Sequence, residues 1–530
     1  MLFHTWPFLL FMLVVLPVFY ALRWTRWWVP WLLAASYFFY GWWNPYYLLL
    51  VFYSTALDYL LVAFMDHSPV GGVGGWGYAR SLPRDRVLRA AFVVSSLLTL
   101  ALGAGALAGP ATLRPALAVF AALVFLMAAG AWLGSRRVWL LISLVNNLAL
   151  LLFFKYARFV AENVNQVLAS LHAGLRVPDP ATLMPHGLAY VLPVGISFFT
   201  FQSMSYTIDF YYGKVTRERD FLRFATFVCF FPQLMAGPIE RAKHMLPQFH
   251  RPPDFRLQNL TDGMSLFLVG LFKKVALANY LAAYVDPVYE RPGVYGGAAL
   301  ALATFAFAWQ IFFDFSGYTD MARGVARMMG FNLILNFNNP YLSAGLGEFW
   351  SRWHISLSTW FRDYVYIPLG GSRNGTLRTY RNLFIVFLVS GIWHGAAWTF
   401  AVWGVLHAAG VMLTRELERS SFYRERVPTP LKQAWVFLYV CFAWIFFRAA
   451  SLSDAALIVN RIFTAAWTNP YFPWLMLALV AAVWVYQFVF ESRLRPVLRF
   501  APVRVGLAVA MLLYLSLCPA GEKPFIYFQF

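Results

Sequence analysis

Long apolar runs constrain the fold of this chain more than any other feature. A helix needs about 20 apolar residues to cross the hydrocarbon core of a bilayer, and such runs recur along the 530 residues. They lie at residues 6–22, 46–64, 90–109, 115–133, 138–154, 296–313, 382–413, 434–447 and 476–490. With shorter candidates, they predict roughly eleven to thirteen spans. Spanning strands would need alternating segments of about ten residues, whereas these runs are continuous, so we predict an all-α integral membrane protein.

The composition excludes a chain of soluble domains. Hydrophobic residues make up 61% of the sequence and charged residues only 12%, about half the charge of a typical soluble domain. The cysteines, Cys229, Cys441 and Cys518, lie far apart in apolar surroundings, which predicts neither a disulfide framework nor a zinc site. The glycine-rich stretch 71–77 lacks a strand–turn–helix context, so we expect a flexible loop rather than a phosphate-binding loop.

The net charge of +19 would suit a nucleic-acid partner, but its distribution indicates a membrane topology instead. The basic residues gather in alternate short loops: Arg23 and Arg26; Arg80, Arg84, Arg86 and Arg89; Arg136 and Arg137. The intervening connections 41–45 and 110–114 carry almost no charge. This positive-inside pattern predicts that the N-terminus lies outside the cytoplasm and that nucleic acid is not a partner. The first apolar run has no basic segment before it and no cleavage site after it, so we expect a retained span.

Polar groups interrupt the apolar pattern in the middle third of the chain, and such groups at membrane depth mark function unless they pair structurally. Four segments carry most of them: residues 231–241, 313–320, 348–358 and 390–396. The first holds two prolines and a glycine, which predicts a broken or re-entrant element. For the third we expect a helix in the membrane interface, anchored by Trp350, Trp353 and Trp360. The fourth places His394 well inside a long apolar run.

His394 is the strongest candidate for a catalytic residue. A buried neutral imidazole beside small residues suits a general base that accepts a proton from a hydroxyl; the alternative is a hydrogen-bonding core residue. His354 is either a second catalytic group or an interfacial residue. We expect no metal, because no HExxH motif occurs and His407 would be offset from His394 by roughly 140° on one helix. No GxSxG motif is present, so a serine-hydrolase mechanism has no support.

Two aspartates, Asp314 and Asp320, leave a rival interpretation open. Aspartates inside a membrane could couple protons or ions in a transporter. The alternative, which we favour, is that they pair with Arg323, Arg327 or Arg352 and hold helices together.

The four segments, in this order, resemble the membrane-bound O-acyltransferase (MBOAT) family. The string FWSRWHISLSTW at residues 349–360, followed by Arg362, Asp363 and Tyr364, is long and specific. The resembling stretch runs from about residue 192 to residue 403, while the N-terminal third is similar mainly in hydropathy. Within the family, the sequence is most similar to the bacterial branch that acetylates alginate, other exopolysaccharides or peptidoglycan.

The resemblance implies a fold, a reaction and a set of site residues. The fold would be a ring of tilted helices around a central channel, with re-entrant and interfacial helices. His394, at the middle of the channel, corresponds to the family's invariant histidine, and His354 corresponds to its second. Arg362, Asp363 and Asp314 are candidates for orienting the site or the donor. The reaction would move an acetyl group from a cytoplasmic thioester, acetyl-CoA, to a hydroxyl presented from the other side, and it implies no bound cofactor.

The resemblance also implies a location and partners. The protein would be a multi-pass protein of the bacterial cytoplasmic (inner) membrane, in contact with membrane lipid. It would pass the acetyl group to an extracytoplasmic SGNH-type acetyltransferase partner or to a glycan acceptor. We expect one polytopic domain over residues 1–530, with N-terminal spans at 1–155, the catalytic core at 156–415 and C-terminal spans at 416–530.

Several alternatives stay open at this point. The acceptor could be alginate, cellulose, peptidoglycan or another glycan. A transporter or flippase for a glycan or lipid-linked substrate is the main rival, although the inverted repeats expected there are not found. A related acyltransferase scaffold acting on lipid or protein hydroxyls is the third interpretation.

The last six residues form the pattern Phe-x-Tyr-x-x-Phe, with Tyr527 at its centre. This pattern resembles the C-terminal motif of small partner proteins in the D-alanylation branch of the family, whose tyrosine is thought to carry the acyl group. The basic loop at 493–504 should be cytoplasmic, so one crossing through 505–518 would bring Tyr527 to the other side. A phenol has a pKa of about 10, which makes its ester more activated than an alkyl ester. We therefore predict that Tyr527 is an acyl relay; the alternative is an aromatic anchor at the membrane interface.

Overall fold

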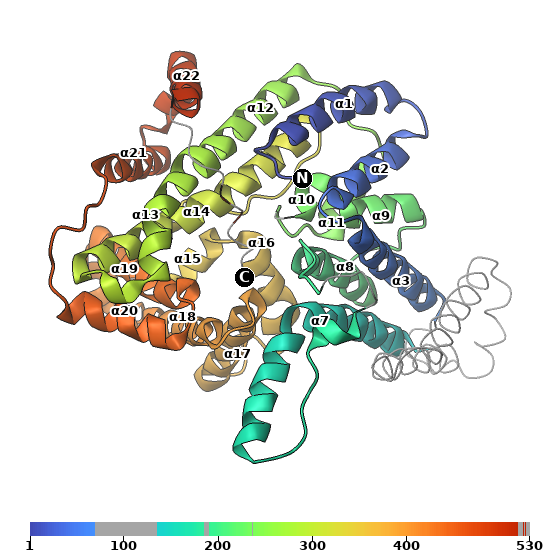
Figure 1. Cartoon of the computed structure of the whole chain (residues 1–530). Coiled ribbons are helices and arrows are strands. Elements are labelled where there is room, and N and C mark those ends of the chain that lie inside the picture. The colour runs from blue at the N-terminus through green and yellow to red at the C-terminus, as the bar shows by residue number, and fades with distance from the viewer. Residues whose placement is uncertain (69–134, 185–189, 236, 518–522, 524, 526–530) are drawn as a thin grey trace. The chain divides into compact units, whose positions relative to one another are not determined.

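The computed structural model describes residues 1–68, 135–184, 190–235, 237–517, 523 and 525, and every regular element in these ranges is a helix (Figure 1). The predicted all-α class is confirmed. The apolar runs at 90–109 and 115–133, the glycine-rich stretch 71–77, Cys518 and Tyr527 lie outside the described residues.

The chain divides into two compact units. Unit 1 comprises Met1, Trp6–Met235 and Ile239–Asp254. Unit 2 comprises Leu2–Thr5, Ala236–Pro238 and Phe255–Phe530, and it therefore contains His354 and His394. The predicted bounds of the catalytic core, residues 156–415, stay a prediction.

Unit 1 is built from long helices followed by short ones. They are α1 (Trp6–Leu22), α2 (Trp28–Gly41), α3 (Leu48–His67), α7 (Arg136–Ser170), α8 (Ile196–Tyr211), α9 (Phe221–Cys229), α10 (Phe231–Leu234) and α11 (Ala242–Met245). The short 3₁₀ turns Pro45–Tyr47, Pro180–Leu183 and Leu246–Phe249 belong to the same unit.

A buried carboxylate ties three helices of unit 1 together. Asp58 on α3 accepts hydrogen bonds from Ser143 Oγ at 2.6 Å and Asn147 Nδ2 at 2.8 Å, both on α7, and from Ser203 Oγ on α8. Its side chain is fully buried. Because a buried polar group without partners is costly, this set of donors holds α3, α7 and α8 in one register.

The backbone of unit 1 is broken where the sequence predicts it. Cys229 ends α9, the four-residue helix α10 follows, and α11 begins only at Ala242. Gly195, just before α8, has φ 77°, and a Cβ there would lie 2.5 Å from the carbonyl oxygen of Leu234 in α10. Only glycine permits this conformation together with such a close approach. The predicted interruption at residues 231–241 is thus confirmed as irregular backbone covered by protein.

Unit 2 contains the longest run of consecutive helices. They are α12 (Leu257–Leu271), the π-helix η6 (Phe272–Ala278), α13 (Asn279–Glu290), α14 (Gly297–Met328), α15 (Leu346–Arg352), α16 (Ile355–Phe361), the π-helix η9 (Arg362–Tyr366), α17 (Thr376–His394), α18 (Trp398–Leu417), the π-helix η10 (Phe422–Arg426), α19 (Thr429–Arg448), α20 (Leu452–Thr464), α21 (Trp474–Glu491) and α22 (Ala501–Leu517). Short 3₁₀ turns lie at Pro292–Val294, Pro340–Leu342 and Arg495–Arg499.

Glycines bring α12 and α14 into backbone contact, and the two helices run side by side (Figure 1). A Cβ on Gly270 would lie 2.5 Å from the carbonyl oxygen of Gly317, and one on Gly263 would lie 2.7 Å from that of Gly324. The two glycines on each helix are seven residues apart, or about two turns. Small residues at this spacing let helices in a membrane approach closely and pack by van der Waals contact.

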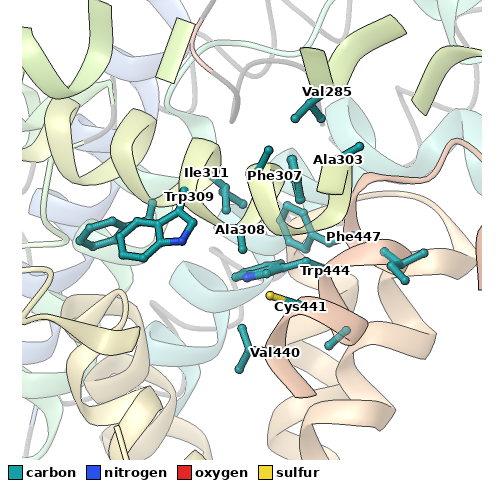
Figure 2. Close-up of a cluster of buried hydrophobic side chains, with 14 of the residues drawn as sticks. Val285, Ala303, Phe307, Ala308, Trp309, Ile311, Val440, Cys441, Trp444 and Phe447 are labelled. Atoms are coloured by element: carbon teal, nitrogen blue, oxygen red, sulfur yellow. The ribbon is translucent and has the colours of Figure 1, made fainter. Parts of the chain in front are cut away.

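The hydrophobic core of unit 2 lies where α14 packs against α19. Figure 2 shows Phe307 and Ala308 of α14 near Trp444 and Phe447 of α19, and all four side chains are buried. Aromatic rings dominate this cluster and bury large areas with defined geometry. It forms a rigid support for the residues that follow along α14.

Six helical segments in the described part of the chain are long and apolar enough to cross a membrane, and two shorter apolar helices add to them. Six of the predicted runs, at 6–22, 46–64, 138–154, 296–313, 434–447 and 476–490, coincide with helices. The run at 382–413 is different, because it forms two helices, α17 and α18, separated by extended backbone at Gly395 with φ −165°. The orientation of the N-terminus relative to the membrane stays a prediction.

The α12–α14 contact generates a stability prediction. We expect Gly270→Val to lower the midpoint of thermal unfolding in detergent, because the added side chain overlaps the backbone of Gly317 and Met321. Overpacking of this kind costs about 1–3 kcal/mol. Gly293→Ala is the matched control, since a Cβ there has no neighbour within 4 Å. Equal midpoints for the two variants would contradict the close crossing.

Candidate active site

His394 is the last residue of α17 rather than an interior residue of a long helix, which corrects the sequence-based expectation. The chain breaks at Gly395 and returns in α18, which packs against α17. Glycines allow this close return: a Cβ on Gly391 would lie 3.1 Å from the Cα of Gly404, and one on Gly395 would overlap the ring of Phe400. The glycines thus place His394 at a helix end inside the protein.

Aromatic rings surround the His394 side chain. Its imidazole lies edge-to-face against Trp393 and Trp403, with ring centroids 5.0 Å apart in both cases, and against Phe447 at 5.3 Å. The side chain is only 4% exposed. Edge-to-face packing restricts the orientation of a ring. The surroundings therefore hold the imidazole in place and exclude bulk water.

A third histidine, His407, contacts one of the aromatic residues around His394, although the sequence indicated that it is not a metal ligand. His407 is on α18, and its Nδ1 accepts a hydrogen bond from Trp350 Nε1 at 3.3 Å. Its ring contacts Trp403 with a centroid distance of 4.6 Å. The predicted 140° offset between His394 and His407 assumed that both lie on one continuous helix. They lie on two different helices, so this reason for expecting no metal is wrong. Among the described residues, no group of three or more His, Cys, Asp or Glu side chains is arranged to hold a metal ion.

His354 is buried in unit 2 and is not an interfacial residue. It separates α15 from α16, where it is the N-cap residue of α16 with φ 43° and ψ 54°. Left-handed backbone is uncommon for a residue with a side chain and persists only where the surroundings impose it. Here the ring of Phe315 lies perpendicular to the imidazole with centroids 4.7 Å apart.

Asn336 fixes both the loop and the tautomer of His354. Its Oδ1 accepts hydrogen bonds from the backbone N–H of Ser356 at 3.1 Å and from the Ser356 hydroxyl at 2.9 Å. Because a backbone N–H can only donate, the atom of Asn336 at this position is the amide oxygen. His354 Nδ1 lies 3.2 Å from the same oxygen and must therefore donate a proton to it. In the neutral ring, the lone pair is then on Nε2.

Burial holds the pKa of His354 well below its usual range. Desolvation disfavours the charged imidazolium, and the hydrogen bond from its own backbone offsets only part of this effect. The imidazole is therefore neutral near pH 7. A neutral ring with a defined tautomer can accept or relay a proton in one direction.

Trp393 connects the two predicted histidines. Its ring lies 6.5 Å from the His354 ring and 5.0 Å from the His394 ring, centroid to centroid. The rings of both histidines therefore lie near the ring of one tryptophan. Their catalytic roles stay predictions.

The expected interfacial helix around Trp350 is wrong in its main feature. The segment forms two short helices, α15 and α16, and Trp353 and Trp360 are 1% and 4% exposed. Trp353 packs against the rings of Phe337 at 5.1 Å and Trp444 at 5.2 Å. Burial against other aromatic rings removes more apolar area from water than an interfacial position would.

The two aspartates pair with cations, but not with all the predicted ones. Asp320 accepts from Lys273 at 2.7 Å and from Arg323 at 3.4 Å, so the pairing with Arg323 is confirmed. Asp314 instead forms an ion pair with Lys274 at 2.6 Å, and the two side chains are 4% and 1% exposed. Lys273 and Lys274 both belong to η6, where the wider π-helical turn faces α14.

Arg362 and Asp363 lie on η9 and form an ion pair with each other at 2.9 Å. Arg362 also lines a cavity of about 230 Å³ together with Trp350, Phe387 and Ser390. Ser390 is four residues before His394 on α17 and therefore on the same face of the helix. The cavity follows this face of α17, with a guanidinium at one part of its wall.

Sequence reasoning missed Lys274, Asn336 and the aromatic wall of the site. The sequence could have indicated Lys274, because a lysine inside an apolar run is as unusual as His394 in its apolar run. Asn336 and Phe447 carried no such signal, since an asparagine in a polar loop and a phenylalanine in a span are both ordinary. Their roles depend on long-range contacts.

Comparisons with known proteins identify relatives of this chain. Residues 195–453 match the membrane-bound O-acyltransferase family. The chain is 37% identical over 433 residues to a probable alginate O-acetylase AlgI of Pseudomonas putida, which covers 76% of this chain and 86% of that protein. The chain belongs to the membrane-bound O-acyltransferase family. It is therefore a multi-pass membrane protein and an O-acyltransferase, and the transporter alternative is not supported.

More distant members of the MBOAT family also match. A peptidoglycan O-acetyltransferase of Helicobacter pylori is 36% identical over 353 residues, which are 61% of this chain and 64% of that protein. A teichoic acid D-alanyltransferase of Streptococcus thermophilus is 30% identical over 281 residues, or 49% of this chain and 67% of that protein. The predicted ring of helices around a central channel stays a prediction.

The lowered pKa of His354 generates a prediction about this MBOAT protein in acid. Below pH 6.5 the unfolded chain binds a proton at residue 354 that the folded chain does not, so stability falls as the pH falls. We expect His354→Asn to lose less stability than wild type between pH 7.5 and 5.5, by about 1 kcal/mol. Asparagine tolerates the left-handed backbone at this position and does not titrate.

Thermal unfolding in detergent at the two pH values measures this difference. His172→Asn is the matched control, because His172 is exposed and also has a positive φ of 52°. The control should show the same pH dependence as wild type. If His354→Asn also does, His354 is not held neutral by burial.

Proposed function

We propose that this MBOAT protein moves an acetyl group from a cytoplasmic thioester donor to a hydroxyl of an extracytoplasmic polysaccharide, with His394 as the general base. The observation that carries the proposal is the position of His394, at a broken helix end between Trp393, Trp403 and Phe447. The names of the relatives support acetylation of alginate or peptidoglycan. Acetyl-CoA is the proposed donor.

The proposed reaction requires one proton acceptor and a leaving thiolate. His394 takes the proton of the acceptor hydroxyl, and the oxygen attacks the carbonyl carbon of the thioester. The carbon–sulfur bond then breaks, and the imidazolium returns the proton to the thiolate sulfur. The carbonyl end of α17 carries a partial negative charge, which stabilises the imidazolium that forms beside it.

His354 is proposed as the second catalytic group. Its neutral ring donates from Nδ1 to Asn336, so Nε2 is the nitrogen that can accept a hydrogen bond or a proton. Both histidines pack against Trp393. We propose that this shared ring keeps the two histidines near the same reacting groups.

Arg362 is proposed to bind the donor. Its side chain is 60% exposed and lines the cavity along α17. A guanidinium suits the phosphate oxygens of a coenzyme A donor, which it can bind by two parallel hydrogen bonds. Asp363, paired with Arg362, orients it. Asp314 is proposed to orient the site, since its partner Lys274 fixes it next to Phe315, which contacts His354.

The partners follow from the same proposal. The protein lies in the bacterial cytoplasmic (inner) membrane, where the thioester and the polysaccharide are on opposite sides. An extracytoplasmic SGNH-type acetyltransferase receives the acetyl group, or the glycan receives it directly. The proposed substrate class is a cell-surface glycan.

Replacing His394 tests the catalytic assignment. We expect His394→Ala to reduce transfer of labelled acetyl from acetyl-CoA by 10²–10⁴-fold, because it removes the acid–base part of catalysis. The protein should stay in the membrane at normal amounts. The control is His67→Ala, the same change at an exposed histidine near the end of α3. Transfer by purified His394→Ala protein at nearly the wild-type rate would contradict the role of His394.

We further propose that Tyr527 relays the acyl group between the histidine site and the acceptor. The proposal rests on the Phe-x-Tyr-x-x-Phe pattern of the last six residues and on the leaving ability of a phenol. His394 would take the proton of the phenol, and the tyrosyl oxygen would attack the thioester carbonyl; the carbon–sulfur bond would break, and the imidazolium would return the proton to the thiolate. The acceptor hydroxyl would then attack the carbonyl of the acetyl ester, and the phenolate of Tyr527 would leave and take up the proton of that hydroxyl.

Tyr527→Phe separates the relay from an aromatic anchor, because it removes only the hydroxyl. We expect glycan acetylation in cells to be lost while membrane insertion and protein amount are unchanged. Phe528→Tyr is a useful second variant, since it adds a hydroxyl one position away and should not restore activity to Tyr527→Phe. Full glycan acetylation by Tyr527→Phe would reject the relay and leave the anchor.

A further inference from the structure

We propose that Asp286 and Phe525 are positioning elements that dock the end of the chain beside both histidines. The inference rests on the proposed relay by Tyr527 and identifies what would hold that residue in reach of the site. It starts from the last two described residues, Lys523 and Phe525. Each has a defined partner in unit 2.

The first anchor is an ion pair. Lys523 Nζ lies 3.0 Å from Asp286 Oδ2 on α13, and Arg448 Nη2 lies 3.1 Å from the other carboxylate oxygen. One carboxylate thus joins two cations, one from the end of the chain and one from the end of α19. The residue before Arg448 is Phe447, whose ring lies 5.3 Å from the ring of His394. The ion pair therefore attaches residue 523 to the end of α19, one position along the chain from the ring that packs against His394.

The second anchor is aromatic. Phe525 is fully buried, and its ring centroid lies 4.7 Å from that of Tyr318 and 5.7 Å from that of Phe315. Phe315 is the residue that packs perpendicular to His354 at 4.7 Å. The ring of Phe3 also packs against the ring of Tyr318, with centroids 4.7 Å apart. Phe525 is thus one side chain away from the second histidine.

The two anchors act on a very short piece of chain. Lys523 and Phe525 are two residues apart, and Tyr527 follows Phe525 by another two. Two residues of fully extended chain span at most about 7 Å. Fixing Phe525 therefore limits the volume that the Tyr527 hydroxyl can explore. A tethered reactant loses less entropy when it reaches its partner, which is the advantage of this arrangement.

A contribution to stability does not explain the ion pair between Lys523 and Asp286. The Lys523 side chain is 44% exposed, and partly exposed ion pairs contribute little to stability. Their effect on where a short piece of chain lies can still be large, because the ion pair fixes one residue of that piece. We therefore assign Asp286 a positioning role, whereas His394 and Tyr527 are the groups that react.

A charge exchange tests the ionic anchor. We expect Lys523→Glu to lower the fraction of Tyr527 that carries acetyl about tenfold, measured by mass spectrometry of the acid-quenched C-terminal peptide. Lys523→Arg should keep it near the wild-type value. The double variant Lys523→Asp with Asp286→Lys should restore it, since the group then still has one carboxylate and two cations. Lys243→Glu, at an exposed lysine of α11, controls for the charge change itself.

A photo-crosslink tests docking without any transfer reaction. A benzoylphenylalanine at position 525 should crosslink to the α14 peptide that contains Phe315 and Tyr318. The crosslink should fall in Lys523→Glu and return in the charge-exchanged protein. No crosslink to α14 in the otherwise wild-type protein, or full acetyl occupancy in Lys523→Glu, would overturn the proposal.

The two readouts separate this inference from the relay. If the crosslink forms and responds to the charge exchange while Tyr527→Phe remains fully active, the docking stands and the relay fails. If Tyr527→Phe is inactive but the crosslink is absent, the relay stands and the docking by Asp286 and Phe525 fails.

Discussion

The buried ion pair between Lys274 and Asp314 is the interaction on which the site depends most. Both side chains are almost fully buried, and removing one partner of such a pair typically costs about 3–5 kcal/mol because the other charge stays unpaired. The pair lies beside the glycine contact of α12 and α14, so it fixes how η6 faces α14. The next residue along α14 is Phe315, which contacts both His354 and Phe525. An electrostatic constraint at membrane depth thus sets the position of the wall against which a candidate catalytic histidine packs.

Both candidate histidines lie where a helix is interrupted. His394 ends α17, and His354 precedes α16 in left-handed backbone. A buried interruption of a helix is tolerated where its free backbone groups find hydrogen-bond partners. Asn336 meets this requirement around His354, since its backbone and side-chain oxygens accept the N–H groups of Ile355 and Ser356. An interruption also brings a side chain to the end of a helix, where the helix dipole acts on it.

The sequence was sufficient for the class and the family, because these depend on local signals. Apolar runs predict helices, and a histidine in such a run is visible without any structure. The helix break after His394 was not predicted, although Gly391 and Gly395 flank it, because their effect depends on Phe400 and Gly404 in the returning helix. The burial of Trp353 was missed for a similar reason, since an amphipathic aromatic residue fits an interface or a core equally well. The partner of Asp314 depends on how η6 packs against α14, which composition does not reveal.

The aromatic surroundings of His394 have a chemical consequence for acyl transfer. A thioester that meets water beside a base can be hydrolysed, and the acetyl group is then lost to the acceptor. Rings that pack edge-to-face around the imidazole leave it 4% exposed, so a base at this position, as proposed for His394, would be shielded from bulk water. Exclusion of water also strengthens the interaction of the helix end with a developing imidazolium, because the local dielectric is low. If His394 is the base, as proposed, the same packing that fixes the orientation of the histidine would favour transfer over hydrolysis, and a polar residue in place of Phe447 would weaken both effects together.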